Sequence, residues 1–300
     1  MSSGRKLYMF QNLLICTDLN DGLHRLVRFV PSLAASGIRK LVFFHSVRVD
    51  DDRGVPKVDK AAMEAARQSL SIAQENVPDG VDVEVVVESD RIVDNILHTI
   101  KTHHCDLVLL GTDNKTLLNE KLFGSTTAEL VERIKIPLLV VRPALMSTYT
   151  REELDLRCRH LLRYLLIAYN DGQTAKDLVQ QISQVARDRP DNSLESCLLA
   201  WAIESKHRRE IPQSQTLEEA QQALTTVKEE LEQLNLTVTT EVREQERLKA
   251  MMDLAMEYDI SAIAVNSPSI PRLLEWSRPN FANLLLRRSW HPVLFFPDPD

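Results

Sequence analysis

The residues best suited to chemistry lie in segment 111–127, which reads GTDNKTLLNEKLFGSTT. Gly111 and Gly124 let a backbone approach a bound group closely, because glycine has no side chain to obstruct it. Residues 125–127 (Ser-Thr-Thr) supply hydroxyls and backbone N–H groups at the start of a helix expected over 125–134, where the helix dipole favours an anion. These residue types therefore favour a phosphate-binding loop in this segment.

A carboxylate is expected opposite this segment, across the crevice at the carboxyl ends of the strands. Asp18 follows the short apolar run 12–17, and at that position it is suited to accept hydrogen bonds from the hydroxyls of a ribose. Lys115 and Lys121 lie in the intervening loop and add positive charge near a phosphate. Together these residues favour a nucleotide as ligand.

A purely structural interpretation stays open for the same residues. Thr126 and Glu129 have capping-box spacing, so the hydroxyl cluster would simply begin a helix. Gly124 would be a turn glycine, and Asp18 would cap a helix near residues 21–22. Residue types alone do not decide between the two interpretations.

Alternating strands and helices must position this segment. Apolar runs predict strands over 12–17, 40–47, 81–88, 106–111 and 137–141, and helical spacing predicts helices over 23–36, 60–76, 91–103 and 125–134. We expect Pro31 to kink or shorten the first helix, and the alternating run 81–88 to form an edge or half-exposed strand. Apolar strands separated by helices indicate a doubly wound parallel sheet covered on both faces, which binds ligands at the carboxyl ends of its strands.

The second half repeats this order. Predicted strands lie at 164–169, 197–203, 236–242, 260–265 and 292–296, with helices over 175–186 and 216–234. Residues 106–137 align with 261–292 at a constant offset of 155, and the first strands align at an offset of 152. The pattern predicts an internal duplication, with domains at 1–145 and 146–300. Capping boxes predict helix starts at Thr150 with Glu153 and at Thr216 with Glu219.

Segment 111–125 resembles the universal stress protein family. Nucleotide-binding members have glycine, two residues, glycine, nine residues, glycine, then serine or threonine; here Gly111, Asn114, Gly124 and Ser125 fill those places, with Asn114 as the departure. Asparagine tolerates positive φ better than other non-glycine residues, so it keeps the turn while it either weakens or reshapes the site. Residues 17–18 and 45–47 also resemble the family's strand ends.

The resemblance implies a HUP-type nucleotide-binding fold with two five-stranded sheets in the order 3-2-1-4-5, paired as a pseudo-dimer through strands such as 138–141. It implies ATP or a related adenine nucleotide as ligand in the first domain, with or without Mg²⁺. The implied binding residues are Thr17, Asp18, Val47, Leu110, Gly111, Asp113, Asn114, Gly124, Ser125, Thr126 and Thr127.

The second copy lacks this pattern. The places of Gly111, Asn114, Gly124 and Ser125 hold Asn266, Ser269, Pro279 and Asn280. Proline has no N–H to offer a phosphate. Asn170 stands in the place of Asp18, and Phe281 in that of Thr126. We expect the second domain to bind no nucleotide and to act in dimerisation, regulation or the recognition of something else.

Composition excludes several classes of protein. The formal net charge is −7, and residues 1–148 hold 18 basic against 19 acidic side chains while residues 149–300 hold 18 against 24. A general nucleic-acid binder would be basic, so none is expected. No apolar run approaches the roughly 18 residues that span a bilayer, and residues 5–12 do not form a signal peptide, so we expect a cytoplasmic protein without membrane insertion.

Other motifs give little. CxxC spacing is absent among the four cysteines, which are expected to be buried free thiols: Cys16, Cys105, Cys158 and Cys197. The weak candidates for metal ligands are His103, His104 and residues 50–52, so no metal site is predicted. There is no P-loop, nucleophile elbow, general base or arginine finger, so catalytic residues are not assigned and any ATP hydrolysis would be slow.

The leading hypothesis is a cytosolic tandem stress-response protein that binds an adenine nucleotide in its first domain. The alternative is a regulatory scaffold that binds no nucleotide and acts through an unidentified protein partner. The runs 138–141 and 293–296 would present apolar edges, which predicts a homodimer or larger assembly unless they pair within one chain.

Overall fold

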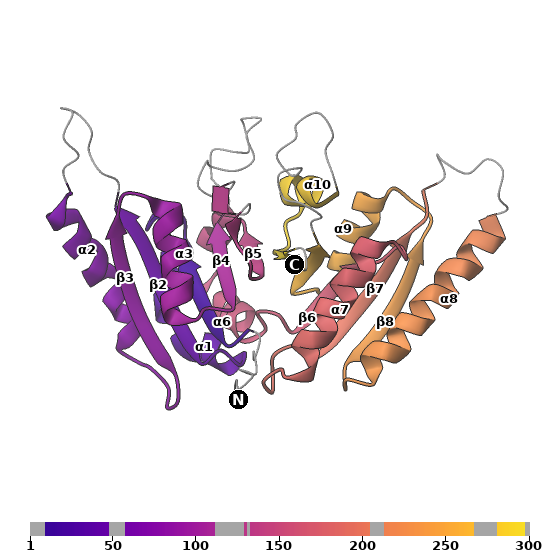
Figure 1. Cartoon of the computed structure of the whole chain (residues 1–300), viewed down its shortest axis with the longest axis horizontal. Helices are drawn as coiled ribbons and strands as arrows, with labels where there is room; N and C mark the ends of the chain where they lie inside the picture. Colours follow the sequence, from indigo (N-terminus) through magenta and orange to yellow (C-terminus); the bar gives the residue numbers. More distant parts are fainter. Residues whose placement is uncertain are drawn as a thin grey trace, which may run out of the picture. The chain divides into compact units, whose positions relative to one another are not determined.

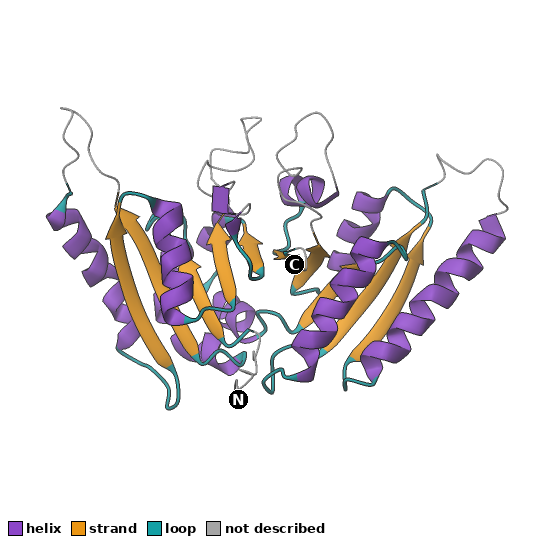
Figure 2. Ribbon diagram, viewed as in Figure 1, coloured by secondary structure: helices purple, strands orange, loops and turns teal. Residues whose placement is uncertain are grey.

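The computed structural model describes residues 10–47, 58–111, 129–130, 133–204, 213–266 and 281–297. Two compact units are present: an N-terminal unit that ends at Arg159 and a C-terminal unit that begins at His160. In each unit, helices pack against a sheet of parallel strands (Figures 1 and 2). The predicted α/β class is confirmed.

The N-terminal sheet has the hydrogen-bonded order β3-β2-β1-β4-β5, with all neighbours parallel. Its strands are β1 (Asn12–Cys16), β2 (Lys40–Val47), β3 (Asp82–Ser89), β4 (Leu107–Gly111) and β5 (Leu138–Val141). β1 and β5 are almost entirely buried, whereas β3 buries only Val83 and Val87, as predicted for an edge or half-exposed strand. The strand order is the predicted one within this unit, and the order in which strands are added to the sheet reverses between β1 and β4. Doubly wound sheets bind ligands at the carboxyl ends of the strands beside such a reversal.

The helix predicted over 23–36 is interrupted. It consists of a 3₁₀ helix, η1 (Leu23–Arg28), and a short helix, α1 (Val30–Ala35), with Pro31 in the first turn of α1. Proline fits a first helical turn because the N–H it lacks has no partner there anyway. The predicted effect of Pro31 is therefore confirmed. The helices that follow in this unit are α2 (Lys60–Leu70), η2 (Ser71–Gln74) and α3 (Ile92–His103).

Two further helices complete the N-terminal unit, namely α5 (Pro143–Thr148) and α6 (Arg151–Arg159). The predicted capping box begins α6: the N–H of Thr150 donates to Glu153 Oε2 at 2.7 Å, and the N–H of Glu153 donates to Thr150 Oγ1 at 3.3 Å. Ser32 on α1 donates a hydrogen bond to the carboxylate of Asp155 on α6. The compact unit thus extends past residue 145, where the first domain was predicted to end; the domain assignment itself stays a prediction.

The C-terminal sheet has the order β8-β7-β6-β9-β10, again with parallel neighbours. Its strands are β6 (Tyr164–Ala168), β7 (Ser196–Ala202), β8 (Thr237–Arg243), β9 (Ala262–Asn266) and β10 (Val293–Phe296). Its helices are α7 (Gln173–Arg187), α8 (Gln213–Glu232), α9 (Arg247–Glu257) and α10 (Phe281–Arg288).

Helices were predicted less well than strands. Each strand begins and ends within two residues of its predicted bounds, because buried apolar runs are unambiguous. Helix α8 begins at Gln213 and not at Thr216, so the capping box predicted to open it is wrong. The helices α5, α9 and α10 were not predicted, and the expected helix over 125–134 lies largely outside the described residues.

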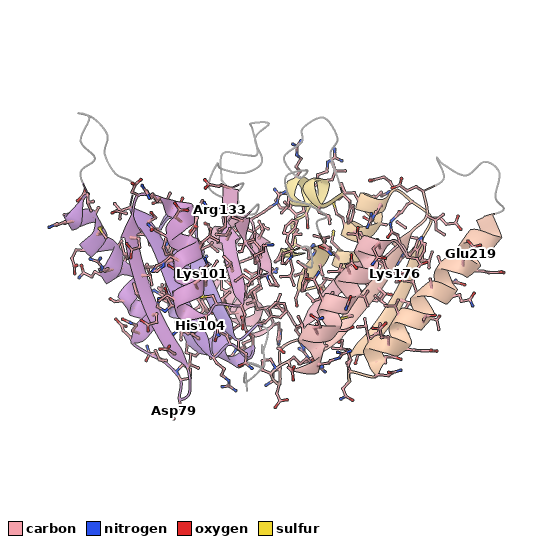
Figure 3. All side chains as sticks on the ribbon, viewed as in Figure 1. Asp79, Lys101, His104, Arg133, Lys176 and Glu219 are labelled. Carbon is pink, nitrogen blue, oxygen red and sulfur yellow. The ribbon has the colours of Figure 1, made fainter. Side chains whose placement is uncertain are left out.

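The strands fill the core of each unit, and charged side chains stand on the outer helix surfaces. Lys101 on α3, Lys176 on α7 and Glu219 on α8 are exposed examples (Figure 3). All four cysteines are free and buried, as predicted. Burial raises the pKa of the Cys105, Cys158 and Cys197 thiols to about 12 and that of Cys16 well above its usual value.

Candidate functional site

The carboxyl ends of β1 and β4 lie side by side. Cys16 pairs with Leu110 in the sheet register, so Thr17 follows at the level of Gly111 on the neighbouring strand. The N–H of Thr17 extends the pairing to β2 by donating to the carbonyl of Phe44 at 3.0 Å. The sheet therefore brings together the predicted residues Thr17, Leu110 and Gly111, with Asp18 one residue further along.

A buried carboxylate organises the loop after β1. Asp21 accepts hydrogen bonds from Thr17 Oγ1 at 2.7 Å, from the N–H of Leu23 at 2.9 Å and from the N–H of Asp18 at 3.3 Å. Its side chain is only 8% exposed, and this burial raises the pKa of the carboxyl, with hydrogen bonding by Thr17 as the largest opposing effect. Sequence reasoning missed this role, since residues 21–22 entered it only as the place of a helix that Asp18 would cap.

Asp18 itself is exposed at this edge. Its Oδ1 accepts from the N–H of Asn20 at 2.8 Å in a local turn, and Leu19 adopts a positive φ of 67° within it. The residue before η1 is Gly22, and no side chain caps that helix. Asp18 is therefore not a helix cap, which removes one part of the structural alternative and leaves its carboxylate accessible.

The end of β2 supplies the third side of the crevice. His45 lies beside β1, with Nδ1 at 2.9 Å from the carbonyl oxygen of Thr17. Val47 is the last residue of β2 and is buried, so it presents apolar surface. Ser46 Oγ is buried and has no hydrogen-bond partner. The remaining predicted residues lie outside the described part of the chain: Asp113, Asn114, Gly124, Ser125, Thr126 and Thr127.

The equivalent edge of the C-terminal unit has different chemistry. Asn266 ends β9 at the place of Gly111; it is 8% exposed, and neither Oδ1 nor Nδ2 of its amide has a hydrogen-bond partner. Tyr169 stands in the place of Thr17, and its hydroxyl donates to Asp171 Oδ1 at 3.1 Å. Larger side chains therefore occupy the positions that glycine and threonine hold in the first unit. Ser269, Pro279 and Asn280 lie outside the described residues.

A half-buried arginine lies at the same edge. Arg247 lies with its guanidinium carbon 3.9 Å from the centroid of the Phe281 ring, and its Nη2 donates to the carbonyl of Ala168 at 3.5 Å. Burial lowers its pKa, because the charged form is desolvated. Neither Arg247 nor its contacts were found from the sequence, since α9 was not predicted and the partners are far apart in the chain.

Metal sites and membrane spans can be assessed for the described residues alone. Within them, no group of three or more His, Cys, Asp or Glu side chains could hold a metal ion. None of the described helices combines the length and apolar character needed to cross a membrane.

Comparison with known proteins agrees with this architecture. The sequence profile of the universal stress protein family matches residues 9–142. A universal stress protein from Archaeoglobus fulgidus DSM 4304 has a similar structure, with a TM-score of 0.63 and 14% identity over 96% of this chain and 99% of that one. A functionally unknown protein from Pseudomonas aeruginosa PAO1 also has a similar structure, with a TM-score of 0.55 and 14% identity over 96% of this chain and 92% of that one. No curated protein matches the sequence.

The fold and the profile together define the class. The N-terminal unit is a doubly wound α/β domain with Thr17 and Asp18 at the carboxyl end of β1, beside the end of β4. Residues 9–142 match the sequence profile of the universal stress protein family, and the N-terminal unit has the corresponding fold. At 14% identity the solved structures establish the fold alone.

Proposed function

We propose that this protein is a cytosolic stress-response protein whose N-terminal unit binds ATP or a related adenine nucleotide, with or without Mg²⁺. One observation supports this most: the exposed carboxylate of Asp18 lies beside the strand end from which the segment Gly111–Ser125 departs. A nucleotide needs a group for its ribose and a loop for its phosphates, and adjacent strand ends supply both at once.

The residues divide by role in this proposal. Asp18 accepts hydrogen bonds from the ribose hydroxyls, and Gly111 gives room for the ligand beside β4. The N–H groups of Gly124 and residues 125–127 hold the phosphates at a helix start. Thr17, Val47, Leu110, Asp113 and Asn114 complete the walls of the site.

The C-terminal unit is proposed to bind no nucleotide and to have a structural or regulatory role. Asn266 and Tyr169 place side chains where the first unit has Gly111 and Thr17. Pro279 offers no N–H at the place of Gly124. The protein is thus proposed to have one nucleotide-binding site for each chain.

We infer in addition that the two units are copies of one domain. Equivalent backbone hydrogen bonds support this inference. Thr17 N to Phe44 O is 3.0 Å and Tyr169 N to Ala200 O is 2.9 Å, while Asp106 N to Asn12 O and Ser261 N to Tyr164 O are both 2.9 Å. A homodimer or larger assembly also stays a proposal, and light scattering that finds a strict monomer at micromolar concentration would contradict it.

Thermal unfolding with and without Mg-ATP tests nucleotide binding. A ligand that binds only the folded state raises stability, by about 2.7 kcal/mol at a hundred times its Kd. We expect millimolar Mg-ATP to raise the Tm of the wild type and of Asn170→Ala, and to leave that of Asp18→Ala nearly unchanged. The matched substitution at Asn170 removes the equivalent side chain from the second unit. No shift for the wild type would refute the proposal.

A regulatory scaffold without nucleotide is the second candidate, and the observation that favours it is Asn114 in place of the family's glycine. Mass spectrometry of gently purified protein separates the two candidates. A co-purifying adenine nucleotide would exclude the scaffold. Tighter nucleotide binding by Asn114→Gly would show that the asparagine weakens a working site.

A further inference from the structure

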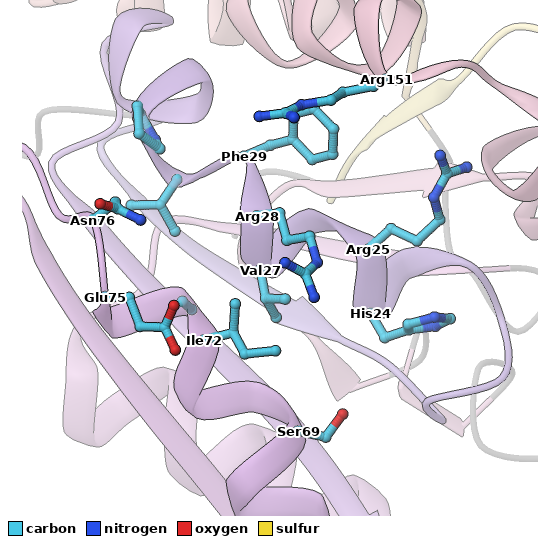
Figure 4. A pocket seen from close by; sticks show the side chains of 13 residues that line it. His24, Arg25, Val27, Arg28, Phe29, Ser69, Ile72, Glu75, Asn76 and Arg151 are labelled. Atoms are coloured by element: carbon cyan, nitrogen blue, oxygen red, sulfur yellow. The ribbon is translucent and has the colours of Figure 1, made fainter.

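A cavity of about 560 Å³ lies on one face of the N-terminal unit, between η1 and α1 on one side and η2 on the other, with the first residue of α6 at its margin (Figure 4). Pockets for small organic ligands commonly measure about 300–1,000 Å³. None of the residues that line this cavity belongs to the predicted nucleotide site, so it is a separate feature of the unit.

The cavity wall is largely apolar. Val27, Phe29 and Val30 come from η1 and α1, and Ile72 and Ala73 come from η2. All of these except Ile72 are buried, at most 6% exposed, so their side chains are held in place by the core. A rigid apolar wall favours the apolar body of a ligand, because its contact with water is removed on binding.

The charge of the lining is mainly positive. Arg25, Arg28 and Arg151 face a single acidic residue, Glu75. In Figure 4 the side chain of Arg28 lies in the middle of the lining, with His24 and Arg25 on one side and Glu75 on the other. The cavity therefore attracts an anion more strongly than a cation.

The arginines are not equivalent. Arg25 donates to the carbonyls of Met146 at 2.5 Å and Tyr149 at 2.9 Å, so it holds the chain between α5 and α6 in place. The side chains of Arg28 and Arg151 make no hydrogen bond or salt bridge with the described residues, although Arg151 is near enough to Asp155 for an electrostatic attraction. His24 Nδ1 is buried and also lacks a partner. Two guanidinium groups thus stay available to a ligand.

We propose that this cavity binds an organic anion with an apolar body, whose charged head pairs with Arg28 under the added attraction of Arg151. The body packs against Phe29 and Ile72. The proposal is independent of the nucleotide proposal, because it uses other residues on a face of the sheet and not the carboxyl ends of the strands.

Two fluorescent probes test the proposal. One is 8-anilinonaphthalene-1-sulfonate, an apolar aromatic body with an anionic head, and the other is N-phenyl-1-naphthylamine, the same body without the head. Both brighten when they leave water. We expect saturable binding of the sulfonate probe at one site and binding of the neutral probe that is about tenfold weaker, since a charge-assisted hydrogen bond is lost. Equal affinities would overturn the proposal.

Variants locate the site. We expect Arg28→Gln to weaken the binding of the sulfonate probe by about tenfold. Arg28→Lys should weaken that binding less, because the charge is kept. Arg39→Gln is the matched control: it removes an equal charge from an exposed position of the same unit, outside the cavity. Asp18→Ala tests independence from the nucleotide site. Wild-type affinity of Arg28→Gln, or equal weakening by Arg39→Gln or Asp18→Ala, would overturn the proposal.

Discussion

The hydroxyl of Thr17 donates a 2.7 Å hydrogen bond to Asp21, a carboxylate that is only 8% exposed at the carboxyl end of β1. The same carboxylate accepts from the N–H groups of Asp18 and Leu23, so it fixes the turn between the strand and η1. Through this turn Asp18 projects into solvent while its own backbone stays anchored. The buried aspartate therefore positions the exposed one.

The two aspartates should respond differently to substitution. Asp21→Ala leaves the Thr17 hydroxyl and two N–H groups without their acceptor, so we expect the free energy of unfolding to fall by about 2 kcal/mol and nucleotide binding to weaken. Asp18→Ala should change stability by less than about 0.5 kcal/mol, because the side chain is exposed, yet abolish binding. Urea unfolding and nucleotide titration measure the two effects. Equal stability losses for both variants would contradict this account of the loop.

A second buried carboxylate makes stability depend on pH. Asp106 lies at the start of β4 and accepts from the N–H groups of Asn12 at 2.9 Å and Gln11 at 3.1 Å; burial raises its pKa to about 7. Because an aspartate in the unfolded chain titrates near about 3.9, the folded state holds an extra proton between the two values. The contribution of Asp106 to stability therefore falls as pH rises from about 4 to about 7, and is constant above that.

Serine is a suitable replacement for Asp106, because its counterpart in the C-terminal unit is Ser261, whose Oγ accepts from the N–H of Tyr164 at 3.3 Å. We expect Asp106→Ser to be relatively more stable at pH 8 than at pH 5, by at most about 2.7 kcal/mol when each is compared with the wild type. Asp79→Ser, at an exposed position (Figure 3), is the control. Parallel stability profiles for wild type and Asp106→Ser would contradict the assigned pKa.

The strands were predictable and several contacts of the site were not. The runs Leu138–Val141 and Tyr164–Ala168 form strands because buried parallel strands are continuously apolar, and this signal is local. The capping box of Thr150 and Glu153 is also a local signal. The burial of Asp21, by contrast, depends on packing between distant segments, so the local sequence did not single out this residue.

The second unit illustrates the same limit. Alignment of the repeats identified Asn266 as the counterpart of Gly111, but its unpartnered amide depends on the fold around it. Arg247 on α9 stacks on Phe281 on α10, and local periodicity carries no information on a contact between separate helices.

The unpartnered amide of Asn266 should be dispensable for stability. Asn266→Leu replaces it with an apolar side chain of the same branched shape and removes two buried polar atoms that lack partners among the described residues, so we expect the free energy of unfolding to rise by about 1 kcal/mol. Denaturant unfolding measures the change. As a control, Asn95→Leu should destabilise, because the Asn95 amide donates to the Asp90 carbonyl at 2.8 Å. Marked destabilisation by Asn266→Leu would show that the amide has a partner.

The four thiols should resist modification in the folded protein. They are buried, and their raised pKa values leave very little of the reactive thiolate at pH 8. We expect a disulfide reagent such as 5,5′-dithiobis(2-nitrobenzoate) to label them only slowly in buffer and all together, within seconds to minutes, in denaturant. Rapid labelling of any one cysteine in the native protein would contradict its burial.

The central claim is one nucleotide site for each chain, retained in the N-terminal unit and lost in the C-terminal unit. Calorimetric titration of the purified protein with Mg-ATP tests it most directly, because the stoichiometry counts the sites. The account predicts one nucleotide bound for each chain, with binding abolished by Asp18→Ala and unaffected by Asn170→Ala. Two nucleotides for each chain, or none, would contradict it.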